Sequence, residues 1–195
     1  MLRTWLRDGE VFAQIVSGTG NGLTPAAGVP FWLEALEPDF IPMTSDAARQ
    51  LQAGDVLRLG ELRGGALHYD PDWQQRPLWL LAAGTGLAPL WGVLREALRQ
   101  HHQGPIRVIH QAHDAAGHYL AEPLQALVAT HPQLDVQLLT ASEQAAFLAQ
   151  LRLVSRQTVA LLCGSPASVE TFARRLFILG VPRSQVLADL FLPHA

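Results

Sequence analysis

The sequence predicts an α/β fold: a doubly wound, five-stranded parallel sheet in the C-terminal part, preceded by a small antiparallel β-barrel domain. Three observations lead to this prediction. Apolar, strand-like runs alternate with amphipathic stretches from residue 78 onward. Turn-forming residues are frequent before that point. Apolar residues make up 49% of the 195 residues and charged residues 16%, so the chain can bury a sizeable core.

Apolar runs predict the strands of the sheet, and amphipathic stretches between them predict its helices. The predicted strands span residues 78–84, 106–112, 134–141, 158–164 and 185–191. The predicted helices span residues 89–101, 120–130, 143–151 and 167–179. Gly180, followed by Pro182, predicts the end of the last helix. Because a helix separates each strand from the next, we expect a parallel sheet that is covered on both faces.

Residues 1–77 have a different character, with turn-rich segments such as "SGTGNGLTPAAGVP". Strand candidates are short, and Ser45 is placed as the N-cap of a short helix. The candidate strands are "EVFAQIV", "DVLRLGE" and "GALHY", and the helix covers residues 45–51. About seventy-seven residues is little for a closed barrel, so we expect an incomplete one that ends near "PDWQQRP".

Charge and cysteine content exclude several classes of function. The net charge of −3 gives no reason to expect a nucleic-acid partner, whose binding requires clustered cations. All fourteen basic residues are arginines, which excludes lysine-based Schiff-base chemistry. The single cysteine, Cys163, excludes an internal disulfide framework and a multi-cysteine metal or iron–sulfur site.

The N-terminal stretch "MLRTWLRDGE" lacks the apolar core of a signal peptide. No uninterrupted apolar run is long enough to cross a bilayer. We therefore expect a cytoplasmic protein without a membrane partner.

The segment "LWLLAAGTGLAPLWG" places Gly84-Thr85-Gly86 between a strand and a helix. Glycines let a ligand approach the backbone, and the free N–H groups at a helix start favour a phosphate. Pro89 suits the first helical turn, although it stands where a third glycine would complete G-x-G-x-x-G. The alternative is that the two glycines serve only a tight turn, and the G-x-G pattern alone does not decide between the two.

A second strand, turn and helix start occur at "LLCGSPASVETF", with Ser165 and Ser168 as candidate caps. In a doubly wound sheet the first and fourth strands are usually neighbours, and ligands bind in the crevice between them. Gly84–Gly86 and Cys163–Pro166 would then face each other. Two such turns at one crevice predict a dinucleotide ligand.

Several motifs resemble the ferredoxin–NADP reductase superfamily. "AAGTGLAPL" resembles its nicotinamide-nucleotide motif, "LLCGSPASV" its C-G-x-P motif and "GVPRSQVLADLF" its C-terminal segment. "HYLAEPLQALVATHPQLDVQLLTA" resembles the middle of the same domain in bacterial NADH-dependent electron-transfer reductases. The resemblance covers residues 78–195, which are thereby identified as an NAD(P)-binding domain.

The resemblance implies that NAD(P)H passes a hydride to a flavin held by the preceding barrel, which then releases electrons singly to an iron–sulfur centre. The family positions that hold the pyrophosphate are matched by Gly84, Thr85, Gly86 and Pro89. The family positions near the nicotinamide are matched by Cys163 and Gly164, and Cys163 is the catalytic candidate. Ser165 and Pro166 complete the motif. Asp189 stands where a glutamate is usual, and Phe191 where an aromatic residue is usual. The alternative for Cys163 is a small buried apolar residue.

Residues 1–77 match the family's flavin domain less well. In the flavin motif R-x-Y-[ST]-x-A, Asn21 replaces the arginine and Leu23 the tyrosine, whereas Thr24 and Ala26 are kept. Ser45 corresponds to a hydroxyl at the flavin pyrophosphate, with a plain N-cap as its alternative. We also expect one or two barrel strands and an upstream iron–sulfur domain of the family to be missing. FAD is therefore a less certain cofactor than the nicotinamide nucleotide.

Histidines gather at His101-His102 and at His110, His113 and His118. His110 falls on a predicted strand and His113 beyond its end, so the two need not converge on a metal. We expect solvated or loop histidines and no metal site. His113 also stands where relatives have an arginine near the adenosine ribose. No arginine cluster follows the second strand, which favours NADH over NADPH.

Two functions remain open. The first is an NAD(P)H-dependent oxidoreductase that passes electrons through a flavin to a redox protein, such as a ferredoxin-like protein or an oxygenase component. The second is a flavin-less relative that binds a nucleotide or docks a partner without catalysis. Gly84–Gly86 and Cys163-Gly164 favour the first, and Asn21 and Leu23 favour the second.

Overall fold

A computed structural model describes residues 2–7, 10–15, 56–60 and 66–190. The chain forms two compact units, Met1–Gly64 and Gly65–Ala195. The described strands of the first unit form an antiparallel sheet in the order β1-β2-β3. They are β1 (Leu2–Arg7), β2 (Glu10–Ile15) and β3 (Val56–Gly60). Two of them match predicted strands, β1 was not predicted, and closure into a barrel stays a prediction.

The second unit contains the predicted five-stranded parallel sheet. Its strand order is β6-β5-β4-β7-β8, and every neighbouring pair is parallel. The strands are β4 (Leu78–Ala83), β5 (Ile106–Ala112), β6 (Leu134–Thr140), β7 (Val159–Gly164) and β8 (Val186–Leu190). The order reverses at β4, so the first and fourth strands of the sheet are neighbours, as predicted.

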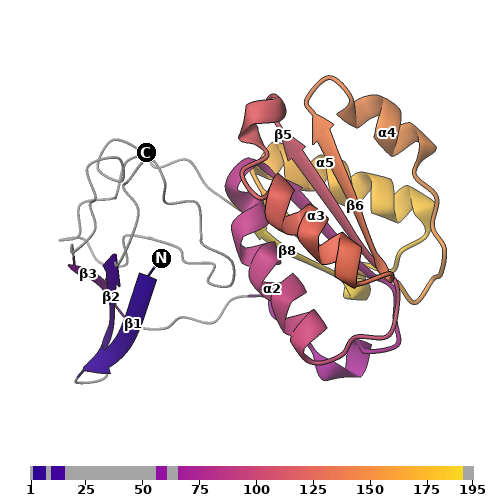
Figure 1. The fold of residues 1–195 in the computed structure, drawn as a ribbon. Coiled ribbons are helices and arrows are strands. Elements are labelled where there is room, and N and C mark those ends of the chain that lie inside the picture. The colour runs from indigo at the N-terminus through magenta and orange to yellow at the C-terminus, as the bar shows by residue number, and fades with distance from the viewer. Residues whose placement is uncertain (1, 8–9, 16–55, 61–65, 191–195) are drawn as a thin grey trace. The chain divides into compact units, whose positions relative to one another are not determined.

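Helices cover both faces of this sheet (Figure 1). Residues of α2 and α3 share one core with the strands, and residues of α4 and α5 share the other. The helices are α2 (Leu87–Arg99), α3 (Ala121–Thr130), α4 (Gln144–Gln150) and α5 (Pro166–Leu179). The doubly wound α/β architecture predicted from the sequence is therefore confirmed.

The central strands are apolar without a break because both of their faces are buried. Leu78 and Leu80 belong to the core beneath α2 and α3, whereas Trp79 and Leu81 belong to the core beneath α4 and α5. Successive side chains of a strand point to opposite faces, which explains this alternation. The two cores hold the carboxyl ends of β4 and β7 rigidly side by side.

The segment before β4 also packs on this unit. Tyr69 is buried in the core, and its hydroxyl lies 2.9 Å from Nδ1 of His102. The backbone N–H of Val159 donates to the Pro77 carbonyl at 2.9 Å. The predicted strand "GALHY" is wrong for residues 66–69, which are irregular because Tyr69 is committed to the core rather than to a strand ladder.

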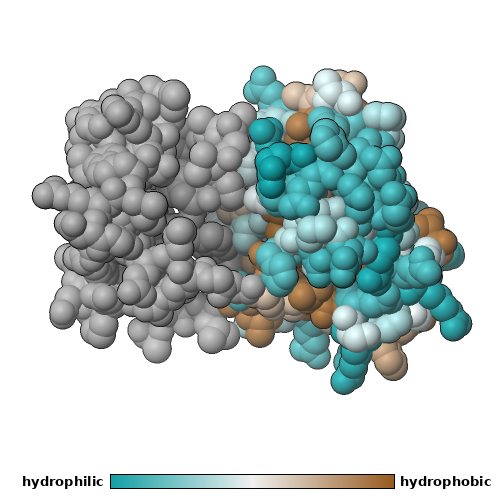
Figure 2. Space-filling view, turned by 90° about the horizontal axis from the view of Figure 1, so that it is seen from below, coloured by the Kyte–Doolittle hydropathy of each residue, from teal (hydrophilic) through white to brown (hydrophobic). Residues whose placement is uncertain are grey.

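The last helix ends as predicted, with Gly180 in the left-handed region at φ +90°. Figure 2 shows a face on which hydrophilic residues predominate and hydrophobic ones form separate patches. In the part of the chain that the structure describes, every helix is too short or too polar to span a bilayer.

Candidate functional site

The candidate site lies where β4 and β7 end side by side. Ala82 of β4 is the register partner of Cys163 of β7, and both strands run into glycine turns at the same edge of the sheet. The structure thus brings together the two turns that the sequence predicted to face each other. This is the crevice at which open α/β sheets bind ligands.

The turn after β4 is the short 3₁₀ helix η3 (Gly84–Gly86). Gly84 has a left-handed φ of +56°, and a Cβ built on it would meet no other atom within 4 Å. Glycine is required by the backbone here, while the space beside it is open. Gly84 and Thr85 are exposed, so a ligand can reach this backbone.

Gly86 has a different role. A Cβ on this residue would overlap the Cys163 carbonyl and lie 2.8 Å from the Gly164 nitrogen. Only glycine lets the start of α2 approach the end of β7 this closely. Gly86 therefore fixes the separation of the two turns.

The start of α2 has no side-chain cap, since its N-cap position is Gly86. The first four N–H groups of a helix have no partner within the helix and carry a partial positive charge. Pro89, the third residue of α2, forfeits no helical hydrogen bond at this position. The Leu87 N–H bonds back to the Gly84 and Thr85 oxygens, so the exposed donor for an anion is the Thr85 N–H of the preceding turn.

The turn after β7 satisfies its own helix start. Ser165 is the N-cap of α5, and its Oγ accepts from the Ser168 N–H at 3.3 Å. Pro166 is the first helical residue. Gly164, at φ +147°, packs so closely on β4 that a Cβ would lie 2.8 Å from Cβ of Ala83. The hydrogen bond from the Ser168 N–H to Ser165 Oγ confirms the capping predicted for Ser165.

His110 supports the turn after β4 from the neighbouring strand β5. Its Nε2 lies 2.9 Å from the Gly84 carbonyl oxygen, and its Nδ1 lies 3.2 Å from Nδ1 of His118. The carbonyl can only accept, so Nε2 of His110 carries the proton. Burial lowers the pKa of His110 to about 4, and the nearby His118 adds to this effect against the opposing hydrogen bond to Gly84. Neutral His110 therefore donates to Gly84 and accepts from Nδ1–H of His118.

Tyr119 holds the next carbonyl of the same turn. Its hydroxyl donates to the Thr85 oxygen at 3.3 Å, and its ring packs edge-on against His110 with centroids 5.7 Å apart. Burial first and Cys163 second raise the pKa of Tyr119, against a hydrogen bond from the Ala88 backbone. The hydroxyl stays protonated and remains a donor.

The expectation of solvated or loop histidines is wrong for His110 and His102, which are 0% and 1% exposed. His110 contacts His118 rather than the exposed His113. A strand position flanked by apolar residues could have indicated burial. The partner Gly84 carbonyl could not have been found without the strand order.

Cys163 is 0% exposed and belongs to the core beneath α2 and α3. Burial, and then the Asp189 carboxylate on β8, raise the pKa of the Cys163 thiol to about 12, against a smaller effect of the Gly164 backbone. Asp189 is the register partner of Cys163 and is exposed. The thiol is neutral at physiological pH, which suits a wall of the crevice better than a nucleophile.

Carboxylates mark the ends of β5 and β6. Exposed His113 and Asp114 follow β5, and the Asp114 carboxylate accepts from the Gly117 N–H at 3.1 Å. Glu143 follows β6 and accepts from the Thr140 N–H at 2.8 Å. Hydrogen bonds from Thr140 lower the pKa of Glu143, so this carboxylate stays ionised.

The predicted site residues Thr24, Ser45 and Phe191 lie outside the described residues.

Comparison with known protein families gives a match for this unit. Residues 80–175 match the family model described as "Oxidoreductase NAD-binding domain". Over this domain the chain is similar to members of the ferredoxin reductase-like superfamily.

Curated relatives show the same similarity. The chain is 30% identical over 129 residues to the naphthalene 1,2-dioxygenase system ferredoxin–NAD(P)(+) reductase component of Pseudomonas putida, covering 60% of this chain and 39% of the relative. It is 31% identical over 182 residues to the reductase component of the naphthalene 1,2-dioxygenase/salicylate 5-hydroxylase systems of a Ralstonia species, covering 88% and 54%.

A similar fold occurs in the flavohem-like FAD/NAD-binding domain of nitric oxide dioxygenase from Vibrio cholerae. The TM-score is 0.64 at 23% identity, with 73% of this chain and 61% of that chain covered. Against the curated relatives above, this chain spans about half of their length or less.

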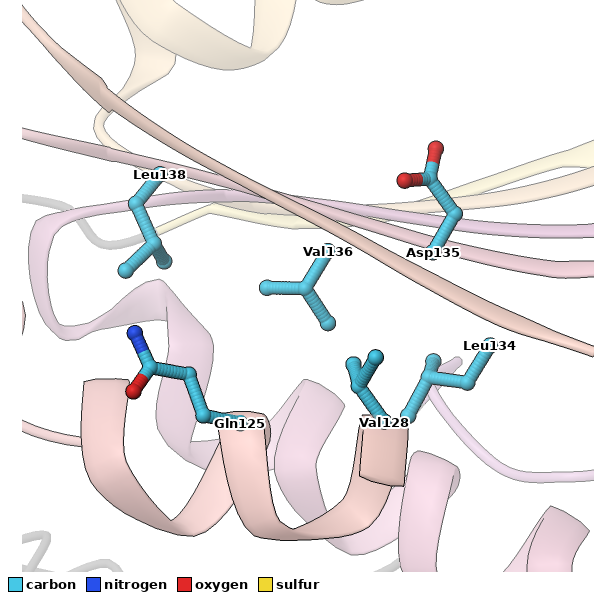
Figure 3. Close-up of a pocket in the computed structure, with 6 residues that line it drawn as sticks. All are labelled: Gln125, Val128, Leu134, Asp135, Val136 and Leu138. Carbon is cyan, nitrogen blue, oxygen red and sulfur yellow. The ribbon is translucent and has the colours of Figure 1, made fainter. Parts of the chain in front are cut away.

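A separate cavity of about 300 Å³ lies between α3 and the edge strand β6 (Figure 3). Asp135 points away from α3, and its Oδ2 accepts from Nε of Arg107 at 2.8 Å. The cavity is lined by Gln125, Val128, Leu134, Asp135, Val136 and Leu138. Strand β5 separates it from β4, so it is distinct from the crevice between the β4 and β7 turns.

Metal ligands do not assemble in the described part of the chain, where no group of three or more His, Cys, Asp or Glu residues could hold an ion.

Proposed function

We propose that the chain is an NADH-oxidising reductase that passes electrons through a flavin to an iron–sulfur or other redox protein. The nicotinamide dinucleotide binds in the crevice between the turns after β4 and β7. The observation that carries this proposal is the exposed turn at Gly84 and Thr85, where left-handed Gly84 borders open space at the edge on which β4 and β7 end side by side. The match of residues 80–175 to an oxidoreductase NAD-binding domain supports the same ligand.

The described residues fit such a ligand. Gly84, Thr85 and Gly86 supply backbone donors for the pyrophosphate, and Pro89 shapes the helix start behind them. An added Cβ at Gly84 would enter the open space where the ligand approaches. When bound, the dinucleotide supplies a hydride.

The turn after β7 would form the nicotinamide end of the crevice. Cys163 and Gly164 would limit its depth, and Ser165 and Pro166 its entrance. Neutral Cys163 presents no thiolate that could add to the nicotinamide ring. Asp189 lies beside it on the next strand, and Phe191 follows on the same segment.

NADH is favoured over NADPH by charge. His113 and Asp114 at the end of β5 and Glu143 at the end of β6 would face the adenosine end of the ligand. Residues 112–119 contain no arginine. Ionised carboxylates would repel a 2′-phosphate, whereas they can accept a hydrogen bond from a ribose hydroxyl.

This preference is tested by the double variant Asp114→Asn, Glu143→Gln, which keeps hydrogen-bond acceptors but removes both charges. The ratio of kcat/KM for NADH to that for NADPH should exceed ten in the wild type and fall several-fold in the variant. Glu122→Gln, an exposed change in the first turn of α3, is the matched control and should leave the ratio unchanged. An unchanged ratio in the double variant would refute the role of charge.

A specific observation favours a second function. Asn21 and Leu23 replace the arginine and tyrosine of the flavin motif, of which Thr24 and Ala26 remain; Ser45 is the other matching flavin-site position. A neutral side chain cannot make the charge-assisted contact of an arginine with a phosphate. The second candidate is a flavin-less relative that binds the nucleotide or docks a redox partner without catalysis.

The visible absorption spectrum separates the two functions. The purified protein is mixed with FAD, freed of unbound flavin and then given NADH. A retained flavin band that NADH bleaches supports the reductase. A colourless protein that retains no FAD, yet binds NADH, contradicts it and supports the second function.

A further inference from the structure

The buried His110 makes two hydrogen bonds beneath the turn after β4. The side chain is 0% exposed and lies on β5, next to β4. Its ring bonds to the Gly84 carbonyl at 2.9 Å and to His118 at 3.2 Å. A buried imidazole is costly unless both nitrogens are satisfied, and here both are.

The two exposed peptide groups of the turn have their carbonyls held from the β5 side. His110 holds the Gly84 oxygen, and Tyr119 holds the Thr85 oxygen; the Leu87 N–H bonds to both oxygens from within the helix. The described peptides are trans, so each N–H points away from the carbonyl of the same peptide group. The Thr85 N–H, on the same peptide group as the Gly84 carbonyl, is consequently turned away from His110, and Thr85 is exposed.

We propose that His110 is a positioning residue for the nucleotide: by holding the Gly84 carbonyl, it aims the Thr85 N–H at the pyrophosphate. His118 fixes the tautomer of His110 that can do this, by donating its Nδ1–H. The identity of the ligand in this inference rests on the proposed function. The tautomer of His110 and its effect on the turn are independent of that function. The low pKa of His110 keeps the ring neutral at physiological pH, so the donor pattern persists.

Three variants test the proposal by isothermal titration with NADH and with ADP-ribose. His110→Phe keeps an aromatic ring of similar size but has no donor for the Gly84 carbonyl. The dissociation constant for both probes should rise roughly 3- to 10-fold, as expected for the loss of one neutral hydrogen bond. His110→Gln offers an amide donor and should recover part of the affinity.

His102→Phe is the matched control. His102 is equally buried and bonds at Nδ1 to Tyr69, but it lies before β5, at the opposite end of the strand from the turns. This variant should leave nucleotide affinity unchanged even if it lowers the melting temperature. Equal affinity losses in His102→Phe and His110→Phe would reduce His110 to a general packing residue and overturn the proposal.

A second readout needs no ligand. Nitrogen-15 spectra of the imidazoles at pH 7 should show His110 neutral with its proton on Nε2 and His118 with its proton on Nδ1. A proton on Nδ1 of His110 would overturn the proposal, whether or not NADH binds. If the spectra are as expected and the wild type binds neither probe, the proposed function fails while the arrangement of the turn stands.

In that case amide exchange decides whether His110 orients the turn. The Leu87 N–H, which bonds to the Gly84 and Thr85 oxygens, should exchange faster in His110→Phe than in the wild type. Unchanged exchange would overturn the claim that His110 holds this turn.

Discussion

The turns after β4 and β7 look alike in sequence but differ in what they leave available. Both follow a buried strand, contain glycine and open a helix. After β7, Ser165 caps the helix itself. After β4, no side chain caps the helix, and Gly84 borders open space. The first turn has donors for a ligand, whereas the second one uses a donor internally.

The comparison teaches that a glycine turn is a ligand site only when its donors are free. His110 and Tyr119 strengthen the contrast, because they hold the carbonyls of the β4 turn and turn the exposed Thr85 N–H away from themselves. The sequence suggested two equal phosphate turns; under the proposed function the β4 turn binds the ligand and the β7 turn forms the opposite wall.

The largest expected effect is the loss of stability in Gly86→Ala. The added methyl would overlap the Cys163 carbonyl, and backbone atoms cannot yield as a side chain can. We expect the free energy of unfolding to fall by about 3 kcal/mol or more, since overpacking and backbone shifts add. Urea denaturation measures this, and a loss below about 1 kcal/mol would contradict the close approach of the turns.

The next effect is a pH dependence of stability from His110. The folded pKa of about 4 lies below the ordinary value of 6.5, so the unfolded chain binds more protons between these values. The contribution is complete above pH 6.5 and is lost as the pH falls toward 4. It amounts to on the order of 3 kcal/mol.

The difference in unfolding free energy between wild type and His110→Phe, followed from pH 7 to pH 4, isolates this contribution. His118 and Tyr119 also face the ring, and Glu143 lies near His118, but they are present in both proteins. A difference that does not change with pH would show that His110 titrates normally.

Gly84→Ala should separate binding from stability. Its methyl meets open space, so the cost is the left-handed backbone alone, about 1–2 kcal/mol. NADH affinity should fall at least tenfold, because the methyl enters the ligand's approach. Calorimetric titration beside a melting curve checks both quantities. A folded variant that keeps the full affinity for NADH would show that the ligand does not bind at this turn.

Ser165→Ala should have the smallest effect. Loss of the cap on α5 costs about 1 kcal/mol, with NADH affinity nearly unchanged. If the variant instead loses affinity more than Gly84→Ala does, the roles of the two turns are reversed.

The sequence was sufficient for most of the sheet unit, because apolar runs and amphipathic helices alternate there and each local pattern agrees with the fold. It also placed the β4 and β7 turns together, since strand order in a doubly wound sheet follows a general rule. It missed β1, and it assigned residues 66–69 to a strand although Tyr69 packs in the core.

The missed site residues share one physical cause. His110, His118 and Tyr119 act on Gly84 and Thr85 through contacts between elements distant in sequence. No spacing rule predicts such contacts, because they depend on the side-by-side register of β4 and β5. From the sequence alone, the histidines are interpreted as solvent-exposed or loop residues, with metal ligands as the alternative.

The most direct test is a titration of the wild-type protein with NADH, followed by backbone amide chemical shifts. The account predicts the largest changes at Thr85, Gly86, Leu87 and Ala88, with smaller changes at Ser165 and Ser168. Largest changes at the start of α5, or at the cavity between α3 and β6, would contradict it.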